Sequence, residues 1–240
     1  MQYTLVTGAA SDIGKAICLE LANKGINVLM LDIDESSMCE FINILPNNQF
    51  HRYLKVDFTE TEEAGKKVSD FILSNGMEIE SAVFAAGIFA VKPLRMIKHD
   101  FFLKSLDIAV FSVIQIIQIL TAKKINGNNL KNAVIISSIS ARQGVKGYGM
   151  YSAVKAGLLG LMRSLAVEFA PIRVNAIVPG GIKTKATSFI YDNSDNPNPR
   201  SLLGEGTPID CAKLVMFLLS DESKWITGQE FVIDGGSSVN

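Results

Sequence analysis

The sequence predicts an α/β protein built on a parallel, doubly wound sheet. Short apolar runs, typical of fully buried strands, alternate with longer segments of helical period. A few turn residues join each strand to the next helix. The strand segments do not alternate apolar and polar residues, as expected where helices cover both faces of a sheet. Right-handed crossovers connect such strands.

Seven strands and six helices are expected along the chain. Strands are predicted near residues 2–7, 26–32, 51–56, 81–85, 132–138, 171–178 and 230–234. Helices are predicted near residues 13–24, 35–45, 60–75, 99–124, 149–169 and 208–220. No repeat, low-complexity tract or linker divides the chain, so we expect one domain over residues 1–240. Residues 183–208 are polar and rich in Asn, Pro and Ser, and we interpret them as a lid over a site.

Composition narrows the class of protein. Hydrophobic residues make up 48% of the chain and charged residues 20%, which allows a sizeable core and argues against disorder. Lys and Arg total 23 against 24 acidic residues, a formal net charge of −1. No overall basic field therefore exists to hold nucleic acid or an anionic membrane. The longest apolar region, 108–120, is too short to span a bilayer.

The cysteines and histidines indicate neither a disulfide framework nor a metal site. Cys18, Cys39 and Cys211 are odd in number and widely spaced, which fits a reducing compartment. His51 and His99 stand alone, as satisfied core or surface histidines do. We expect a soluble cytoplasmic protein without a metal.

A glycine-spaced turn follows the first strand. The run TGAASDIG, residues 7–14, passes directly into a helix. Such a turn lets backbone N–H groups at the helix N-terminus face a pyrophosphate, and its candidate contacts are Gly8, Ser11, Asp12, Ile13 and Gly14. The alternative is a tight strand-to-helix turn in which Ser11 or Asp12 is the N-cap.

Asp32 ends the second predicted strand, eighteen residues after Gly14. Its carboxylate can accept hydrogen bonds from the adenosine ribose hydroxyls and would repel a 2′-phosphate. Ser11 leaves the turn without a basic residue that would offset this charge. NAD(H) is therefore favoured over NADP(H). The alternative for Asp32 is an N-cap of the following helix.

Tyr151 and Lys155 stand four residues apart on a predicted helix, so their side chains share one face. A nearby ammonium should lower the tyrosine pKa from about 10 toward neutrality, which suits proton exchange with a carbonyl or alcohol. Ser137 and Ser138 end a buried strand. This places Ser138 at the sheet edge where ligands of open parallel sheets bind. An ordinary strand-to-loop turn is the alternative for the two serines.

Four ordered motifs together resemble the short-chain dehydrogenase/reductase family. They are TGAASDIG, SSIS before YSAVK, RVNAIVPGGIKT and ITGQEFVIDGG. The resemblance implies a Rossmann-like fold with a seven-stranded sheet, a nicotinamide cofactor, and hydride transfer between a secondary alcohol and a ketone. It implies Tyr151 as general acid/base, Lys155 as the residue that holds the nicotinamide ribose and tunes Tyr151, and Ser138 as a hydrogen-bond partner of the substrate oxygen. It further implies cofactor contacts at Asp57, Gly87, Pro179, Gly180, Ile182 and Thr184.

Three positions depart from the family pattern. Asp12 stands where glycine or alanine is usual, so its charge must point away from the phosphates. The usual Asn-Asn-Ala-Gly is Phe84-Ala85-Ala86-Gly87 here. Ala109 aligns with an asparagine that commonly helps to hold a proton-relay water, and a methyl group cannot replace its hydrogen bonds.

The substrate is left open. Ser140, Arg142, Gln143, Tyr148 and the lid are expected at the mouth of the site. Arg142, Lys185 and Arg200 could meet an anionic substrate or be solvated, whereas Phe189, Ile190 and Tyr191 could form an apolar wall.

The helices near 99–124 and 149–169 are apolar on most sides. In the family they commonly pair between subunits, which predicts a homodimer or homotetramer; coverage within the monomer is the alternative. The leading functional hypothesis is an NAD-dependent oxidoreductase acting on a secondary alcohol or ketone. The alternatives are a 3-oxoacyl-carrier-protein reductase, although such reductases generally prefer NADP(H), and a catalytically weakened nucleotide-binding partner protein.

Overall fold

A seven-stranded parallel sheet forms the centre of the molecule. We describe residues 1–188 and 201–239 of a computed structural model. The strand order is β3-β2-β1-β4-β5-β6-β7, and every neighbouring pair is parallel. The strands are β1 (Gln2–Thr7), β2 (Asn27–Asp32), β3 (Arg52–Lys55), β4 (Glu78–Phe84), β5 (Asn132–Ile136), β6 (Arg173–Pro179) and β7 (Glu230–Ile233). The predicted fold class is confirmed.

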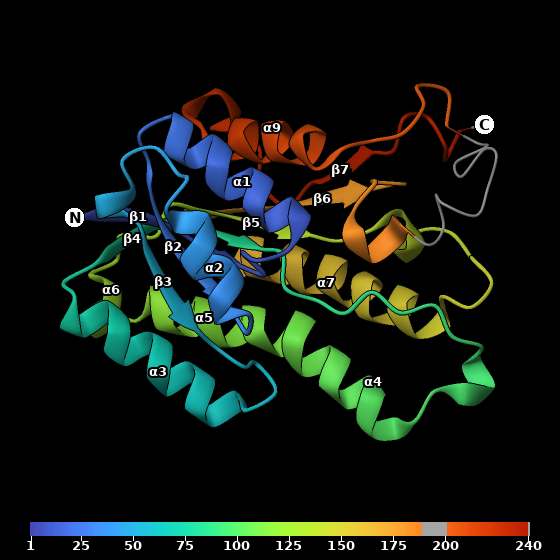
Figure 1. The fold of residues 1–240 in the computed structure, drawn as a ribbon, viewed down its shortest axis with the longest axis horizontal. Coiled ribbons are helices and arrows are strands. Elements are labelled where there is room, and N and C mark those ends of the chain that lie inside the picture. Colours follow the sequence, from blue (N-terminus) through green and yellow to red (C-terminus); the bar gives the residue numbers. More distant parts are fainter. Residues whose placement is uncertain (189–200, 240) are drawn as a thin grey trace.

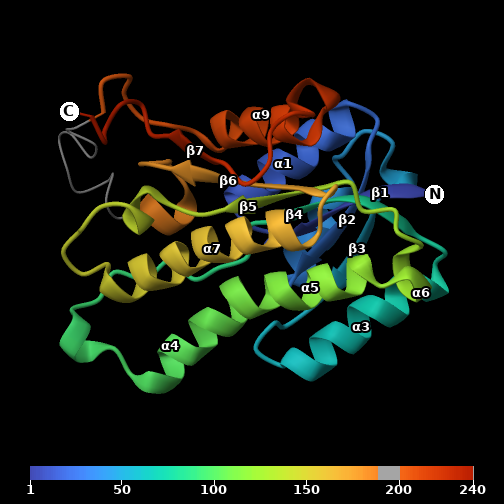
Figure 2. The ribbon, with the colours of Figure 1, turned by 180° about the vertical axis from the view of Figure 1, so that it is seen from behind.

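Helices cover both faces of this sheet (Figures 1 and 2). They are α1 (Asp12–Asn23), α2 (Glu35–Ile42), α3 (Thr61–Ser74), α4 (His99–Leu106), α5 (Ser112–Thr121), α6 (Lys123–Asn126), α7 (Gly149–Glu168) and α9 (Pro208–Leu219). Helices α1, α2 and α9 pack on one face, and α3 to α7 lie on the other.

Successive strand residues enter different cores because side chains alternate across a strand. Leu29 and Leu31 pack on the face of α3, α5 and α7, whereas Val28 and Met30 pack on the face of α1 and α9. Both sets are fully buried. This is why the strands read as continuous apolar runs in the sequence.

The helix predicted at 99–124 is not one regular α-helix. A π-helical turn, Asp107–Phe111, separates α4 from α5, and α5 ends at Thr121 because Ala122 has an extended backbone (ψ 111°). Together α4, the π turn and α5 form a helical stretch, His99–Thr121, of 23 residues. By length and composition alone it could cross a membrane, a property that core helices of soluble proteins share. The apolar run 108–120 is therefore part of a longer helical stretch, and its own length does not exclude a membrane span.

His51 is a satisfied core histidine. Its Nδ1 accepts a hydrogen bond from the backbone N–H of Val28 (3.1 Å), and its Nε2 lies 2.8 Å from the carbonyl oxygen of Pro46. The ring joins β2 to the segment before β3. Across residues 1–188 and 201–239, no group of three or more His, Cys, Asp or Glu is arranged to hold a metal ion.

Candidate active site

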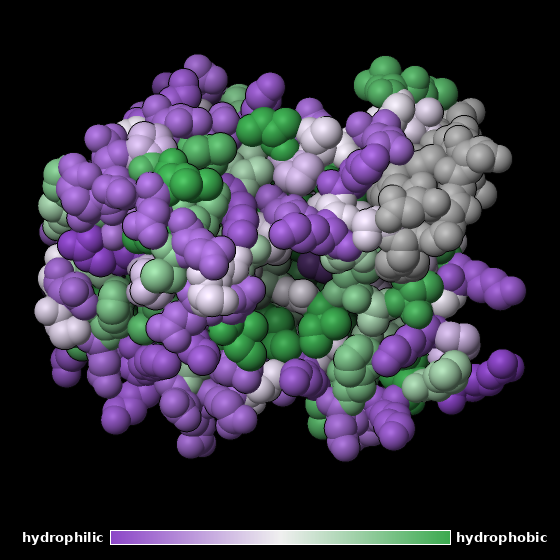
Figure 3. Space-filling view, viewed as in Figure 1, coloured by the Kyte–Doolittle hydropathy of each residue, from purple (hydrophilic) through white to green (hydrophobic). Residues whose placement is uncertain are grey.

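A cavity of about 510 Å³ opens at the carboxyl ends of the central strands. The strand order reverses direction between β1 and β4, and in open parallel sheets ligands bind at this point. Figure 3 shows the molecule hollowed here, with apolar side chains along one side of the hollow. Residues from both the predicted nucleotide end and the predicted catalytic end line this cavity.

The turn between β1 and α1 needs two glycines. Gly8 has φ +67°, and a Cβ there would lie 2.6 Å from the backbone nitrogen of Ala86. A Cβ at Gly14 would lie 2.8 Å from the Cα of Ala9 and closer still to the carbonyl oxygen of Gly8. Any side chain at either position would therefore push the turn out of place. The turn brings the N-terminus of α1 to the cavity, a position suited to a diphosphate.

Ser11 is the N-cap of α1. Its Oγ accepts a hydrogen bond from the N–H of Gly14 (3.1 Å) and donates one to the carbonyl oxygen of Gly8 (2.7 Å). The capping alternative is confirmed for Ser11, and it is compatible with a cofactor role because Ser11, Asp12 and Ile13 all line the cavity. Only some of the first N–H groups of a helix can be capped, so others stay available to an anion.

Asp32 lies at the end of β2 beside this turn. Its Oδ2 accepts a hydrogen bond from the N–H of Ala10 (3.0 Å), and its Oδ1 accepts one from the N–H of Asp34 (3.0 Å). The N-cap of α2 is Asp34, which accepts from the N–H of Ser37. The alternative role of Asp32 as that N-cap is therefore wrong. Its carboxylate is instead fixed next to Ala10, a cavity residue.

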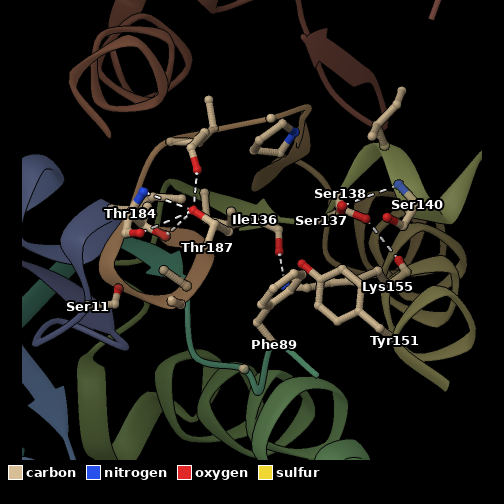
Figure 4. A pocket seen from close by; sticks show the side chains of 18 of the residues that line it. Ser11, Phe89, Ile136, Ser137, Ser138, Ser140, Tyr151, Lys155, Thr184 and Thr187 are labelled. Carbon is tan, nitrogen blue, oxygen red and sulfur yellow. Dashed lines mark hydrogen bonds between the residues drawn. The ribbon is translucent and has the colours of Figure 1, made fainter. Parts of the chain in front are cut away.

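Ser138, Tyr151 and Lys155 meet at the other end of the cavity (Figure 4). Lys155 is 6% exposed, and its Nζ donates a hydrogen bond to the carbonyl oxygen of Ile136, the last residue of β5 (2.9 Å). The same Nζ lies 5.8 Å from the centre of the Tyr151 ring. Ser137 Oγ donates to the carbonyl oxygen of Lys155 (2.9 Å) and so joins α7 to the end of β5. Ser137 is therefore a support for the helix rather than an ordinary turn residue.

The predicted direction of the Tyr151 pKa is wrong for this structure. Burial raises the pKa of Tyr151 to about 12, and a hydrogen bond with the Ser138 hydroxyl only partly opposes this shift. Lys155 Nζ donates its hydrogen bond to the carbonyl oxygen of Ile136 and makes none with the Tyr151 hydroxyl. Burial also lowers the pKa of Lys155 to about 8. At neutral pH the structure therefore holds a protonated phenol beside a mostly protonated amine.

The lowered pKa of Lys155 predicts a stability change with pH. Between about pH 8 and the ordinary lysine pKa of 10.5, the folded protein carries a neutral amine while the unfolded chain keeps its proton, so stability rises with pH in this window. Relative to Lys155→Met, the wild-type protein should gain about 3 kcal/mol of unfolding free energy between pH 8 and pH 10.5. Urea unfolding of both proteins across this window measures the difference. A constant or falling difference would contradict a buried, depressed lysine.

An aromatic cluster, which the sequence did not reveal, borders Tyr151. The Phe89 ring centre lies 5.3 Å from that of Tyr151 and 5.7 Å from that of Tyr148, in edge-to-face arrangements. All three rings line the cavity, and burial raises the pKa of Tyr148 as well. Phe89 follows the end of β4 by five residues. Its place on a loop after a central strand was the only signal that could have identified it.

Ala109 lies close to the cavity residue Gly87. It is buried within the π-helical turn, 2% exposed. A Cβ built on Gly87 would lie 3.5 Å from Lys155 Nζ and 3.9 Å from the Cβ of Ala109, so these three residues are neighbours. A methyl group therefore stands near Gly87, where the family resemblance leads us to expect an amide.

The remaining predicted cofactor contacts divide into two groups. Gly87, Pro179, Gly180, Ile182 and Thr184 line the cavity. Asp57 does not line it; its Oδ1 accepts hydrogen bonds from the N–H and hydroxyl of Thr59 (2.9 and 2.7 Å), and these lower its pKa.

The predicted mouth of the cavity is partly corrected. Ser140, Tyr148 and Lys185 line the cavity. Arg142 and Gln143 do not: Arg142 Nε lies 3.1 Å from Oε2 of Glu230, and Arg163 pairs with the same carboxylate. An ion pair at the start of β7 therefore holds Arg142. Arg200, Phe189, Ile190 and Tyr191 lie outside the described residues, as does the middle of the predicted lid at 183–208.

The fold and the cavity define a dinucleotide-binding α/β oxidoreductase. A family model described as enoyl-(acyl carrier protein) reductase matches residues 8–238. The 3-oxoacyl-(acyl carrier protein) reductase of Thermotoga maritima is 33% identical over 97% of this chain and 96% of its own length. Cyclopentanol dehydrogenase of a Comamonas strain is 30% identical over 100% of this chain and 98% of its own length.

Solved structures give the same result. The structure of 4-hydroxyisoleucine dehydrogenase complexed with NADH matches with a TM-score of 0.90 at 27% identity and covers 100% of both chains. That of ElxO with NADP bound matches with a TM-score of 0.87 at 25% identity, covering 100% of this chain and 99% of the other. The chain belongs to the short-chain dehydrogenase/reductase family. As a member it is an oxidoreductase that binds a nicotinamide cofactor.

Proposed function

We propose that this protein is an NAD(H)-dependent oxidoreductase that interconverts a secondary alcohol and a ketone. The observation that carries the proposal is the single cavity shared by the N-terminus of α1 and by Ser138, Tyr151 and Lys155. The glycine turn at Gly8 and Gly14 suits a diphosphate, so the residues present fit a dinucleotide. When bound, the nicotinamide supplies or accepts the hydride.

The chain's own residues manage the proton. In ketone reduction, the Tyr151 hydroxyl donates its proton to the carbonyl oxygen, and the Ser138 hydroxyl donates a hydrogen bond to the same oxygen. A phenol with a pKa of about 12 is fully protonated at neutral pH and therefore ready to donate. The Lys155 ammonium stabilises the tyrosinate that remains, and the hydrogen bond to Ile136 holds its side chain beside the Tyr151 ring.

The preference for NAD(H) rests on Asp32. Its carboxylate is held at the end of β2 by two backbone N–H groups, where it can accept hydrogen bonds from ribose hydroxyls and repel a 2′-phosphate. Asp32→Ala should lower the ratio of kcat/KM with NADH to kcat/KM with NADPH by about tenfold or more. Asp34→Ala, which removes a carboxylate two residues away, is the matched control and should change the ratio less. An unchanged ratio in Asp32→Ala would assign the preference elsewhere.

The inner wall of the cavity favours an apolar group on the substrate carbonyl. Phe89 and Tyr148 lie against Tyr151, and Ile139 and Val145 also line the cavity, whereas Arg142 is paired outside it. An apolar substituent buried against these side chains gains free energy with the area removed from water. Activity on a series of ketones should therefore rise with the apolar area of one substituent.

A 3-oxoacyl-carrier-protein reductase is the second candidate. Relatives carry this name, and an exposed segment with Lys92, Arg95 and Lys98 lies between β4 and α4. The N–H of Lys92 donates to the carbonyl oxygen of Gly147 (2.9 Å), next to the cavity residue Tyr148. Cations at this rim would attract an acidic carrier protein. A kcat/KM for carrier-linked 3-oxoacyl substrates far above that for free ketones would select this candidate.

A nucleotide-binding protein with weakened chemistry is the third reading, and Ala109 motivates it. NADH titration followed by a panel of secondary alcohols and ketones separates it from the enzymes. Tight binding without turnover across the panel would favour it.

We further propose a homodimer or homotetramer formed through α4, α5 and α7. The outer face of α7 carries small exposed residues at helical spacing, namely Ala153, Ala156, Gly157, Ser164 and Val167. Such a face lets a second helix approach closely. Light scattering should give the mass of two or four chains.

A further inference from the structure

Asp12 connects the glycine turn before α1 (residues 7–14) to residues 184–188, most of which line the cavity from another loop. Its Oδ2 accepts a hydrogen bond from the backbone N–H of Lys185 at 2.6 Å, across 173 positions of sequence. Lys185 begins a 3₁₀ turn, Lys185–Thr187, and every residue of this turn lines the cavity. The Asp12 carboxylate therefore points towards residues 184–188. Its negative charge is then directed away from a phosphate bound at the N-terminus of α1.

The segment that receives this bond is otherwise held from its far side. The Thr187 hydroxyl donates a hydrogen bond to the carbonyl oxygen of Ile182 (2.8 Å) and accepts one from the N–H of Thr184 (2.9 Å) (Figure 4). Both bonds lie within residues 182–187 and make the turn more rigid. The N–H of Lys183 donates to the carbonyl oxygen of Gly206 (2.9 Å). These bonds tie the segment to itself and to residue 206. Among the hydrogen bonds of residues 1–188 and 201–239, the bond from Asp12 joins the segment to the N-terminus of α1.

We propose that Asp12 is a positioning residue that latches residues 184–188 over the cofactor cavity. A carboxylate accepting a backbone N–H forms a charge-assisted hydrogen bond, which is stronger than a neutral one. The bond keeps residues 184–188 in the conformation that binds the cofactor. A larger fraction of the molecules is then competent to bind, and the apparent Kd for the cofactor is lower. The glycine or alanine that is usual at this position could not form the bond. The inference concerns any nicotinamide dinucleotide and does not depend on the NAD(H) preference or on the substrate.

The test is a mutant cycle that removes each partner of the bond. Asp12→Ala removes the acceptor. Lys185→Pro removes the donor, and proline is tolerated at the first position of a helical turn. Each single variant should speed hydrogen exchange at residues 186–188 by about fivefold to tenfold in the absence of cofactor. The double variant should show the same exchange rates at residues 186–188 as the single variants, because either substitution alone already removes the bond.

Two controls separate the hydrogen bond from charge. Lys185→Ala keeps the backbone N–H and should leave the exchange of residues 186–188 within about twofold of wild type. Asp12→Asn keeps an acceptor without the charge. It should bind NADH, by fluorescence titration, at least threefold more tightly than Asp12→Ala does. A merely structural effect of residue 12 would change kcat and KM together, and Asp12→Asn would not restore NADH binding.

Two results would overturn the proposal. One is unchanged exchange at residues 186–188 in both Asp12→Ala and Lys185→Pro. The other is an additive double variant, which would show that the two residues act independently. Lys185→Pro leaves the phosphate-binding turn intact, so the proposal stays testable should Asp12→Ala fail to fold. Because exchange is measured without cofactor or substrate, failure of the latch is distinguishable from failure of the proposed reaction.

Discussion

Replacing Tyr151 with phenylalanine should lower kcat/KM for ketone reduction by about 10²- to 10⁴-fold. The substitution removes the phenol hydroxyl that interacts with Ser138 and leaves the ring packed against Phe89. The dinucleotide end of the cavity is unaffected, so the Kd for NADH should stay close to that of the wild-type protein. Steady-state kinetics and fluorescence titration measure the two quantities.

Tyr148→Phe is the matched control for this prediction. Tyr148 lines the same cavity, its ring centre lies 6.1 Å from that of Tyr151, and burial likewise raises its pKa. The interaction with Ser138 belongs to Tyr151, so loss of the Tyr148 hydroxyl should cost less than tenfold in kcat/KM. If both variants lost activity equally, the proton donor would not be assigned to Tyr151.

Replacing Gly14 with alanine should abolish cofactor binding. The new Cβ would meet backbone atoms of Gly8 and Ala9, and backbone cannot move aside as the end of a flexible side chain can. Relief requires the turn to shift, which displaces Ser11 from its hydrogen bond to the N–H of Gly14. We expect a loss of about 1–3 kcal/mol of unfolding free energy and a Kd for NADH raised beyond measurement. Thermal unfolding and fluorescence titration test both.

Gly160→Ala gives the comparison at a helical glycine with space around it. Apart from the neighbouring residues and backbone of α7 itself, nothing among the described residues lies within 4 Å of a Cβ built on Gly160. Alanine is the better helix former, so this variant should be more stable by up to about 1 kcal/mol and bind NADH normally. A Gly14→Ala protein that bound NADH as well as Gly160→Ala does would show that the turn is not the diphosphate site.

Local sequence patterns identified most of the fold because both faces of the inner strands are buried, as in β5. Strands such as β2 therefore appear as unbroken apolar runs, and the glycine turn follows directly from its spacing. The end of the fourth helix could not be predicted in this way. The apolar periodicity of Ser112–Thr121 runs up to Ala122, where the backbone becomes extended, so the pattern gave no sign of the helix end. The composition of the π-helical turn before it gave no sign of the irregularity either.

The meeting of the three proposed catalytic residues in one cavity could be predicted because they lie close in sequence or at strand ends. Tyr151 and Lys155 share a helix face, and Ser138 follows β5. The state of these groups could not be predicted. The shift of the Tyr151 pKa depends on burial, and the target of the Lys155 ammonium depends on where the end of β5 lies relative to α7.

The sequence by itself determined the sheet, the glycine turn before α1 and the spacing of Tyr151 and Lys155 on one helix face, since each depends on residue spacing within one element or one turn. Only the tertiary structure decided that Asp12 binds the N–H of Lys185, that Arg142 is held by Glu230, and that Phe89 stands against Tyr151. These contacts join residues 62 to 173 positions apart along the chain. Their geometry is set by how the loops after different strands converge at one edge of the sheet, which no local pattern records.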